Sequence, residues 1–451
     1  MQSEAVMEFS ELFHGNNCTF SPCGRFLACI CGDFVEIRYS DTLLKAFKFE
    51  CGGVVKGVSW SCDSVLLICR VGALTLKIFS LRDGTCIASL KQSTGNLRQI
   101  RWAFDGRTVL YLEPLLFRVS VWKICDQYGQ LGLDFIDNVQ PWAKPSYALS
   151  LNGKHLAVVS SGIMHSIEST NLNEAGLAKA DDIAIFSAIS WRIEKRISCN
   201  GIHRVGGIVW NPNSNFIVAW PHDPPDPVLI ICVRSGTIIN SWKSSDKLWP
   251  GVCRVDISPS AQFMTVTSRN SKVHIINCVA WCEELELLHD PSISDSKCLV
   301  YKQANELDNP LFLKVTDRPV SISFLSSLAK TRRKSTISWS SGGRYLASCI
   351  TLAPAVIWIW STAHSFHLSC IIVTKHPVQD FCWDPVCNVL AVVDGQDSVV
   401  LWNADEAKLS CSSICTPVTK MLFQANHLNW RHDGKMLVTS SEQSSSVLEL
   451  P

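Results

Sequence analysis

Cysteine and histidine are the side chains of this sequence best suited to metal binding or catalysis. The chain carries 21 Cys and 12 His. A zinc site needs closely spaced cysteine pairs, but Cys278/Cys282 and Cys411/Cys415 have three residues between partners and no second pair to complete a site. Most other cysteines lie in apolar runs such as 27–31 (LACIC), where a free thiol behaves as a small buried hydrophobe. We therefore expect no metal site and no cofactor.

The histidines and glycines form no recognised catalytic motif. His364 and His367 have no carboxylate or cysteine close in sequence, which is typical of a solvated turn. The pair Gly342-Gly343 falls in a turn between strand-like runs and not before a helix that would bind phosphate. Zinc-protease, nucleophile-elbow and P-loop motifs do not occur. The sequence therefore predicts a protein that is not an enzyme.

Tryptophan and proline together mark loops suited to binding another protein. Trp142 and Trp249 each lie next to a proline between strand-like runs, and tryptophan contributes strongly to interfaces. Each ring either serves as an exposed anchor or covers the edge of the core, and both interpretations stay open. The basic run 330–334 (KTRRK) is either a contact for an acidic partner or a solvated loop. The candidate protein-binding residues are Trp249, Pro250, Trp142, Pro224, Pro225, Arg332, Arg333 and Lys334.

Charge and hydropathy exclude several classes of partner. Lys+Arg 41 against Asp+Glu 40 leaves a net charge of +1, too small to attract nucleic acid or an anionic membrane. No apolar run reaches the roughly 20 residues of a membrane span, and the acidic N-terminal segment lacks the basic region of a signal peptide. With 47% hydrophobic residues the chain can bury a large core. We expect a soluble intracellular protein without membrane or nucleic-acid partners.

One short phrase recurs along the chain and is the strongest indication of the fold. It consists of an apolar residue, often Trp, then a Ser-like residue, a turn and an apolar strand, as in VSWSCDSVLLIC at 58–69. The phrase occurs at intervals of about 40 to 60 residues, with one longer gap. Its nine central residues are Phe20, Trp60, Trp102, Leu149, Trp210, Ile257, Trp339, Trp383 and Trp430.

Two further strand-like segments follow most of these phrases. Residues 74–80 (LTLKIFS) alternate apolar and polar, and residues 86–91 (CIASLK) form a weaker fourth strand. Four short strands with a period of about 45 residues are typical of a β-propeller blade. The sequence therefore predicts an all-β propeller with nine four-stranded blades in a single ring. A ring of seven or eight blades with extra strands is the alternative.

The last repeat lacks a fourth strand, because residues 445–450 (SSVLEL) supply only its third. We expect residues 5–13 to pair with it and close the ring, which removes two exposed sheet edges. The resulting plan is an N-terminal closing strand at 1–13, blades 1–6 at 14–289, an insert loop at 290–335 and blades 7–9 at 336–451.

The repeats resemble those of the WD-repeat superfamily. Segments 207–220 (GIVWNPNSNFIVAW), 355–360 (AVIWIW) and 378–385 (VQDFCWDP) are similar to the centrosomal and spindle-pole family of WD repeat-containing protein eight, the WRAP family. The WD dipeptide itself is missing, since Ser361 follows Trp360 and Asn403 follows Trp402. We therefore expect the Asp-His-Ser-Trp hydrogen-bond network of such blades to be degraded.

The resemblance also implies a function. Members of this family are scaffolds of the centrosome, centriolar satellites and spindle poles, within the cytoplasm and cytoskeleton. The implied partner is a coiled-coil anchoring protein of the synovial-sarcoma-X-breakpoint-interacting type. With it, the scaffold would tether microtubule minus ends near the gamma-tubulin machinery and support spindle organisation and cilium assembly. We expect the partner on the rim that carries residues 221–227 (PHDPPDP) and 247–251 (KLWPG). An RNA- or ribosome-associated propeller of the translation-initiation type is the alternative.

Overall fold

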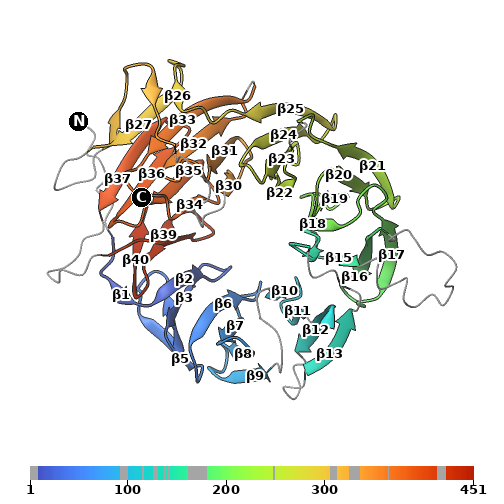
Figure 1. Ribbon diagram of the computed structural model, residues 1–451. Coiled ribbons are helices and arrows are strands. Elements are labelled where there is room, and N and C mark those ends of the chain that lie inside the picture. The colour runs from blue at the N-terminus through green and yellow to red at the C-terminus, as the bar shows by residue number, and fades with distance from the viewer. Residues whose placement is uncertain are drawn as a thin grey trace. The chain divides into compact units, whose positions relative to one another are not determined.

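The computed structural model describes residues 9–91, 100–113, 116–124, 131–136, 139, 143–160, 180–246, 249–304, 312–324, 336–363, 365–413 and 423–450. These residues form strands joined by turns, and none of them lies in an α-helix (Figure 1). Within these ranges the chain has no helix that is both long and apolar enough to cross a membrane.

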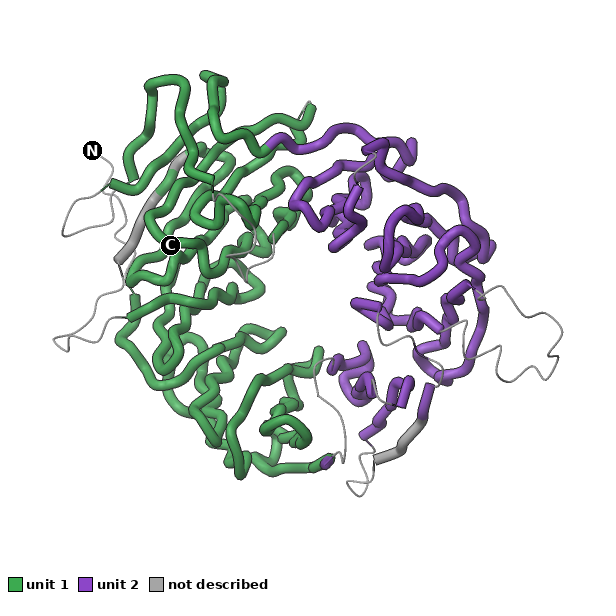
Figure 2. Tube along the Cα trace, in the orientation of Figure 1, with its two compact units in different colours: residues 1–90, 289–451 green, residues 91–288 purple. Residues whose placement is uncertain are grey.

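The strands form nine blade sheets. In each sheet the blade strands pair antiparallel, mostly in chain order; eight sheets have four strands and the seventh has six. The prediction of an all-β, nine-bladed propeller is therefore confirmed. The chain divides into two compact units (Figure 2): unit 1 holds residues 1–90 and 289–451, and unit 2 holds residues 91–288.

Unit 1 contains blades 1, 2, 7, 8 and 9. Blade 1 consists of β2 (Asn16–Phe20), β3 (Phe26–Cys31), β4 (Phe34–Tyr39) and β5 (Lys45–Glu50), and blade 2 of β6 (Val55–Trp60), β7 (Leu66–Val71), β8 (Thr75–Ser80) and β9 (Cys86–Lys91). Blade 7 is built from β30 (Thr336–Trp339), β31 (Tyr345–Cys349), β32 (Val356–Ser361) and β33 (His367–Val373). Blade 8 contains β34 (Asp380–Trp383), β35 (Val389–Val393), β36 (Ser398–Asn403) and β37 (Lys408–Ser413), and blade 9 contains β38 (His427–Trp430), β39 (Met436–Ser440), β40 (Ser444–Glu449) and β1 (Phe13–His14).

Unit 2 contains blades 3 to 6. Blade 3 consists of β10 (Ile100–Trp102), β11 (Thr108–Glu113), β12 (Arg118–Ile124) and β13 (Leu131–Ile136), and blade 4 of β14 (Tyr147–Leu149), β15 (His155–Ser160), β16 (Asp182–Ser187) and β17 (Ile193–Ser198). Blade 5 contains β18 (Val205–Trp210), β19 (Phe216–Pro221), β20 (Val228–Cys232) and β21 (Thr237–Trp242), and blade 6 contains β22 (Val252–Ile257), β23 (Phe263–Ser268), β24 (Val273–Asn277) and β25 (Cys282–Leu287).

The recurring Ser-like residue explains why the phrase forms a tight turn between the first two strands of a blade. The hydroxyl of Ser21 accepts the backbone N–H of Phe26 at 3.1 Å, which satisfies a donor that the turn would otherwise leave unpaired. Asn211 does the same for Phe216 at 3.0 Å. The same bond, from residue i to i+5, joins Ser61 to Leu66, Ser150 to His155, Ser258 to Phe263 and Ser340 to Tyr345.

The core lies between the sheets of adjacent blades in each unit. In blade 1 the residues of the middle strands β3 and β4 are mostly buried, whereas the outer strand β5 carries exposed residues between partly or fully buried ones. Phe49 of blade 1 stacks on Phe79 of blade 2 with ring centroids 4.6 Å apart. Close packing also explains Gly207 in β18, where a Cβ would lie 2.6 Å from the carbonyl oxygen of Lys144 and overlap the ring of Trp220.

The N-terminal segment pairs with the last blade from Phe9 onward, within the described part of the chain. β1 pairs antiparallel with β40 through Phe13 and His14, and an isolated bridge joins Phe9 to Leu448. Between them, the backbone N–H of Ser10 donates to the carbonyl of Val447 at 2.8 Å. Residues 1–8 lie outside the described part of the chain.

The 290–335 segment differs from the expected loop, because its described part forms strands. β27 (Leu299–Gln303) pairs in parallel with β33, and β28 (Phe312–Lys314) pairs with β27. These two strands extend the blade 7 sheet to six strands and cover what would otherwise be its open edge. β26 (Ser292–Ile293) and β29 (Val320–Ser321) form a separate two-stranded ladder.

Candidate functional site

The two loops expected to bind a partner lie side by side in unit 2. Residues 222–227 connect β19 to β20, and residues 243–251 connect β21 to β22, so both leave their blades at the same end of the strands. A Cβ on Gly251 would lie 3.3 Å from Cδ of Pro224. The backbone N–H of Arg269, at the same end of blade 6, donates to the carbonyl of Gly251 at 3.1 Å. We call residues 221–227 and 249–251 the rim loops.

Paired charges surround the exposed prolines Pro224 and Pro225 of the rim loops. Asp226 accepts hydrogen bonds from the backbone N–H of His203 at 2.8 Å and pairs with its ring Nδ1 at 3.0 Å. Asp223 lies 2.9 Å from Nδ1 of His222. This surface offers two prolines within a rim of charged and imidazole groups, which is the composition of a protein-binding site with a polar edge.

Trp249 lies in this rim but packs inward. Its half-buried ring meets Trp242 edge-on at 5.7 Å between centroids and His274 at 5.1 Å. Glu283 holds both neighbours, since it lies 2.6 Å from Nδ1 of His274 and accepts the indole N–H of Trp242 at 3.2 Å. The geometry matches the interpretation in which Trp249 covers the edge of the blade 6 core. Pro250 beside it is half-buried.

Four other candidate residues cannot be placed on this surface. Trp142, Arg332, Arg333 and Lys334 lie outside the described residues. Their role in binding stays a prediction.

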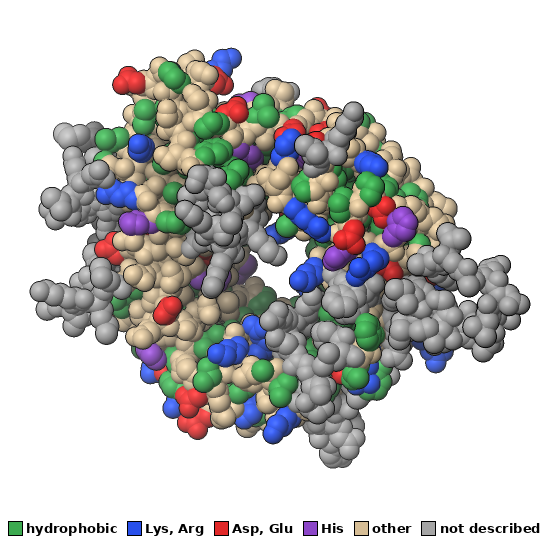
Figure 3. Space-filling model, in the orientation of Figure 1, with side chains coloured by type: hydrophobic (Ala, Val, Ile, Leu, Met, Phe, Trp, Pro, Cys, Tyr) green, Lys and Arg blue, Asp and Glu red, His purple; other side chains and the backbone are tan. Residues whose placement is uncertain are grey.

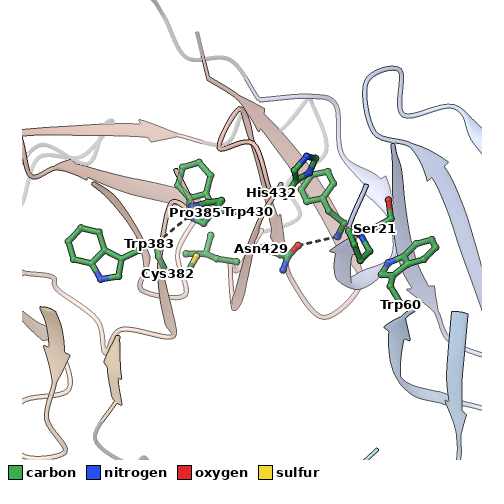
Figure 4. Close-up of a pocket in the computed structure, with 11 residues that line it drawn as sticks. Ser21, Trp60, Cys382, Trp383, Pro385, Asn429, Trp430 and His432 are labelled. Atoms are coloured by element: carbon green, nitrogen blue, oxygen red, sulfur yellow. Dashed lines mark hydrogen bonds between the residues drawn. The ribbon is translucent and has the colours of Figure 1, made fainter. Parts of the chain in front are cut away.

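A second candidate site is a cavity of about 390 Å³ in unit 1, within the range of about 300–1,000 Å³ common for ligand pockets (Figure 4). It lies where the first strands of blades 8, 9, 1 and 2 and the turns after them meet. Its lining residues are Phe20, Ser21, Pro22, Trp60, Cys382, Trp383, Pro385, Leu428, Asn429, Trp430 and His432.

Three of the repeated tryptophans line this cavity, and their indole N–H groups all donate hydrogen bonds to backbone carbonyls. The indole N–H of Trp60 donates to the carbonyl of Thr19 at 3.1 Å, and that of Trp430 to the carbonyl of Cys382 at 3.2 Å. Trp383 donates to Ser338 at 3.0 Å. Each bond joins one blade to the blade before it. The cavity therefore presents aromatic faces and proline rings, and it suits an apolar side chain better than a polar one.

Cys23 follows the cavity-lining residues Ser21 and Pro22 in the chain. Burial raises the pKa of the exposed Cys23 thiol, but hydrogen bonds with the side chains of Ser21 and Ser64 outweigh it and lower the pKa to about 7. Such a thiol is partly ionised at neutral pH, and the thiolate is the form that reacts. This lowered pKa could not be predicted from the sequence, because Ser64 belongs to the turn of the next blade.

The described residues contain no cluster of three or more His, Cys, Asp or Glu side chains able to hold a metal ion. Several of their histidines instead pair with a carboxylate. The ring of His427 lies 2.9 Å from Asp380, whose same oxygen accepts the backbone N–H of Leu428 at 3.0 Å. This pair orients the start of β38.

Blade 7 keeps part of the hydrogen-bond network that the sequence led us to expect degraded. Ser348, fully buried, accepts the indole N–H of Trp360 at 3.0 Å and lies 2.9 Å from Nε2 of His289. His289 also packs edge-on against Trp358 at 4.9 Å between centroids. The network survives here because a Ser and a His occupy the required places although no Asp follows Trp360.

Comparison with known proteins fits this architecture. No known family model matches the sequence. The chain is 25% identical over 444 residues to the WD repeat-containing protein WRAP73 of Mus musculus, which covers 91% of this chain and 89% of the relative. In sequence and in fold the chain is similar to WD-repeat proteins. Its likeness to the WRAP family extends through both compact units.

Solved structures share the propeller fold of this chain at low sequence identity. The C-terminal WD40 domain of Sif2 matches with a TM-score of 0.53 at 10% identity and covers 99% of each chain. A eukaryotic initiation factor matches with a TM-score of 0.61 at 11% identity, covering 91% of this chain and 89% of that one. The Dos1 propeller matches with a TM-score of 0.51 at 9% identity, covering 98% and 95%. At such identities these likenesses concern the fold alone.

Proposed function

We propose that this protein is a non-catalytic scaffold of the centrosome, centriolar satellites and spindle poles. In this role it binds a coiled-coil anchoring protein of the synovial-sarcoma-X-breakpoint-interacting type. The pair tethers microtubule minus ends near the gamma-tubulin machinery and supports spindle organisation and cilium assembly. The observation that carries the proposal is the similarity to WRAP73 along 91% of the chain.

The rim loops are the proposed contact for this partner. They present Pro224 and Pro225 beside the exposed carboxylate of Asp223, on a rim held in place by backbone hydrogen bonds. Rigid loops lose little conformational entropy on binding, which favours affinity. Trp249 contributes by supporting the loop from beneath, since its ring packs on Trp242 and His274.

The surface charge is consistent with a protein partner. On the face drawn in Figure 3, basic and acidic side chains of the described residues are interspersed and form no field of one sign. RNA-binding proteins concentrate Lys and Arg on one face, so the alternative of a ribosome-associated propeller has less support.

Co-purification and proximity labelling from dividing cells test the proposal. The wild-type protein should recover a long coiled-coil centrosomal partner, and Asp223→Lys should lose most of it because the reversed charge lies beside the two prolines. Glu406→Lys is the matched control, since Glu406 is an exposed acid in the turn between β36 and β37.

Each other outcome has a distinct meaning. Equal recovery by both variants would keep the scaffold and move its contact away from the rim loops. Recovery of ribosomal proteins or RNA in place of centrosomal proteins would contradict the proposed function and favour the translation-initiation alternative.

A further inference from the structure

Three large apolar side chains are exposed on neighbouring turns of blades 3 and 4 in unit 2. The exposed fractions are 49% for Phe104, 63% for Leu151 and 87% for Ile189. Phe104 and Leu151 lie in the turns between the first and second strands of their blades, and Ile189 lies in the turn between β16 and β17. In an antiparallel blade these turns lie at the opposite end of the strands from the rim loops.

Contacts between the turns make these residues one continuous surface. A Cβ on Gly153, two residues after Leu151, would lie 3.0 Å from Cβ of Phe104, so the two turns touch. The backbone N–H of Ala188 donates to the carbonyl of Lys154 at 2.9 Å, which places Ile189 beside the turn that carries Leu151. We call Phe104, Leu151, Lys154, Ile189 and Arg192 the turn patch.

The charges around the turn patch are mainly positive. Lys154 and Arg192 are exposed, and neither makes an ion pair with a described residue. Arg234 of blade 5 is a further exposed cation. It lies close to blade 4, because Nζ of Lys195 donates to its carbonyl at 2.6 Å and so connects the two blades.

The nearby acids are already engaged. One oxygen of Asp105 accepts the hydroxyl of Thr108 at 2.6 Å, and Glu194 lies 3.2 Å from Nε2 of His155. Both carboxylates keep their negative charge, but each contacts a partner other than Lys154 and Arg192, so these two cations can still pair with a negatively charged partner.

We propose that the turn patch binds an acidic amphipathic segment of a partner protein, with aliphatic side chains on one face and Asp or Glu on its flanks. Aliphatic groups would cover Leu151 and Ile189, and carboxylates would meet Lys154 and Arg192. The surface consists of turns and offers no strand edge for pairing, so side chains have to carry the recognition. The inference deepens the proposed scaffold role by naming a second contact surface and the chemistry of its partner.

Fluorescence anisotropy with the full chain tests the inference. The probe is a synthetic helical peptide with Leu along one face and Glu on its flanks, and the comparison peptide carries Lys in place of Glu. The acidic peptide should bind the wild-type protein and the basic peptide should not. Ile189→Ser and Arg192→Glu should each weaken binding of the acidic peptide about tenfold, and added salt should weaken it further.

Matched controls come from other exposed positions. Val279, 80% exposed in the turn between β24 and β25, supplies the apolar control Val279→Ser, and exposed Lys243 at the other end of the strands supplies Lys243→Glu. Near-ultraviolet circular dichroism of every variant establishes that it is folded. Equal losses in the controls, or unchanged affinity in Arg192→Glu, would overturn the inference.

Other occupants of the turn patch give different results. Self-association that Ile189→Ser abolishes would identify a second copy of this chain instead, and binding to phosphatidylserine vesicles without peptide binding would identify a membrane surface. Either result overturns the proposal. If the centrosomal partner is recovered from cells while the acidic peptide does not bind, the inference fails and the proposed function stands. If the peptide binds but ribosomal proteins are recovered from cells, the inference stands and the proposed function fails.

Discussion

Replacing Ser348 by Ala tests whether the hydrogen-bond network of blade 7 stabilises unit 1. The substitution removes the acceptor of the Trp360 indole N–H and the partner of Nε2 of His289. Trp360 is only 5% exposed, so its N–H would stay unpaired at a cost of about 1–3 kcal/mol. His289 is half-buried and can turn to water, which makes its loss smaller. The variant no longer buries the hydroxyl of Ser348, which offsets part of this cost. We therefore expect the free energy of unfolding to fall by about 2 kcal/mol.

Thermal unfolding followed by near-ultraviolet circular dichroism measures this loss, which corresponds to about 5 °C in a unit of this size. Ser361→Ala in the same blade is the control. The hydroxyl of Ser361 accepts the backbone N–H of Ala363 in a longer bond of 3.3 Å, so this variant should lose less than about 1 kcal/mol.

A double-mutant cycle with Trp360→Phe separates the hydrogen bond from other effects. Phe keeps an aromatic ring but has no N–H, so Ser348→Ala should cost about 1 kcal/mol less in that background than in the wild type. The reasoning is refuted if Ser348→Ala costs the same in both backgrounds, because the indole bond would then contribute nothing.

Three further predictions follow from other features of the structure. Gly207→Ala should lose more than about 2 kcal/mol in thermal unfolding through steric overlap, whereas Gly342→Ala should be tolerated because its Cβ would meet nothing within 4 Å. Cys23 should react with iodoacetamide at neutral pH before the other exposed turn cysteines, as peptide mass spectrometry would detect, because its pKa is lowered to about 7; equal labelling would contradict this. A hydrogen bond from Arg431 lowers the pKa of Asp433 below its ordinary value of 3.8. The pair therefore stabilises the fold above about pH 4, and this contribution is lost as the pH falls through the lowered pKa. Acid titrations of stability should show a shallower slope in Arg431→Gln, and an unchanged slope would exclude this pair as the cause.

The number of blades was predictable because each repeat carries its own local determinants. The Ser-like residue after the first strand bonds to a backbone N–H five residues later, as Ser21 does with Phe26, and this contact needs no other part of the chain. The insert was misread for the opposite reason. β27 pairs in parallel with β33, from Leu299↔Cys370 onward, and a partner so distant in sequence leaves no periodic signal.

For the tryptophans, too, the sequence predicted one feature and the folded structure was needed for another. Their recurrence at one repeat position indicated a packing role, and the bonds from Trp60 to Thr19 and from Trp383 to Ser338 agree with it. That three of them would also line one cavity depends on the spacing between neighbouring blades. Repeat position alone does not contain that spacing.

Local periodicity was thus sufficient for the fold class and the nine blades. Strand alternation and turn chemistry act over a few residues, so they can be read directly along the chain. The inward packing of Trp249, the network around Ser348 and the meeting of Leu151 with Ile189 required the folded structure. Each of these depends on which side chains from other strands or turns fill the adjacent space, and that is decided only when the blades pack together.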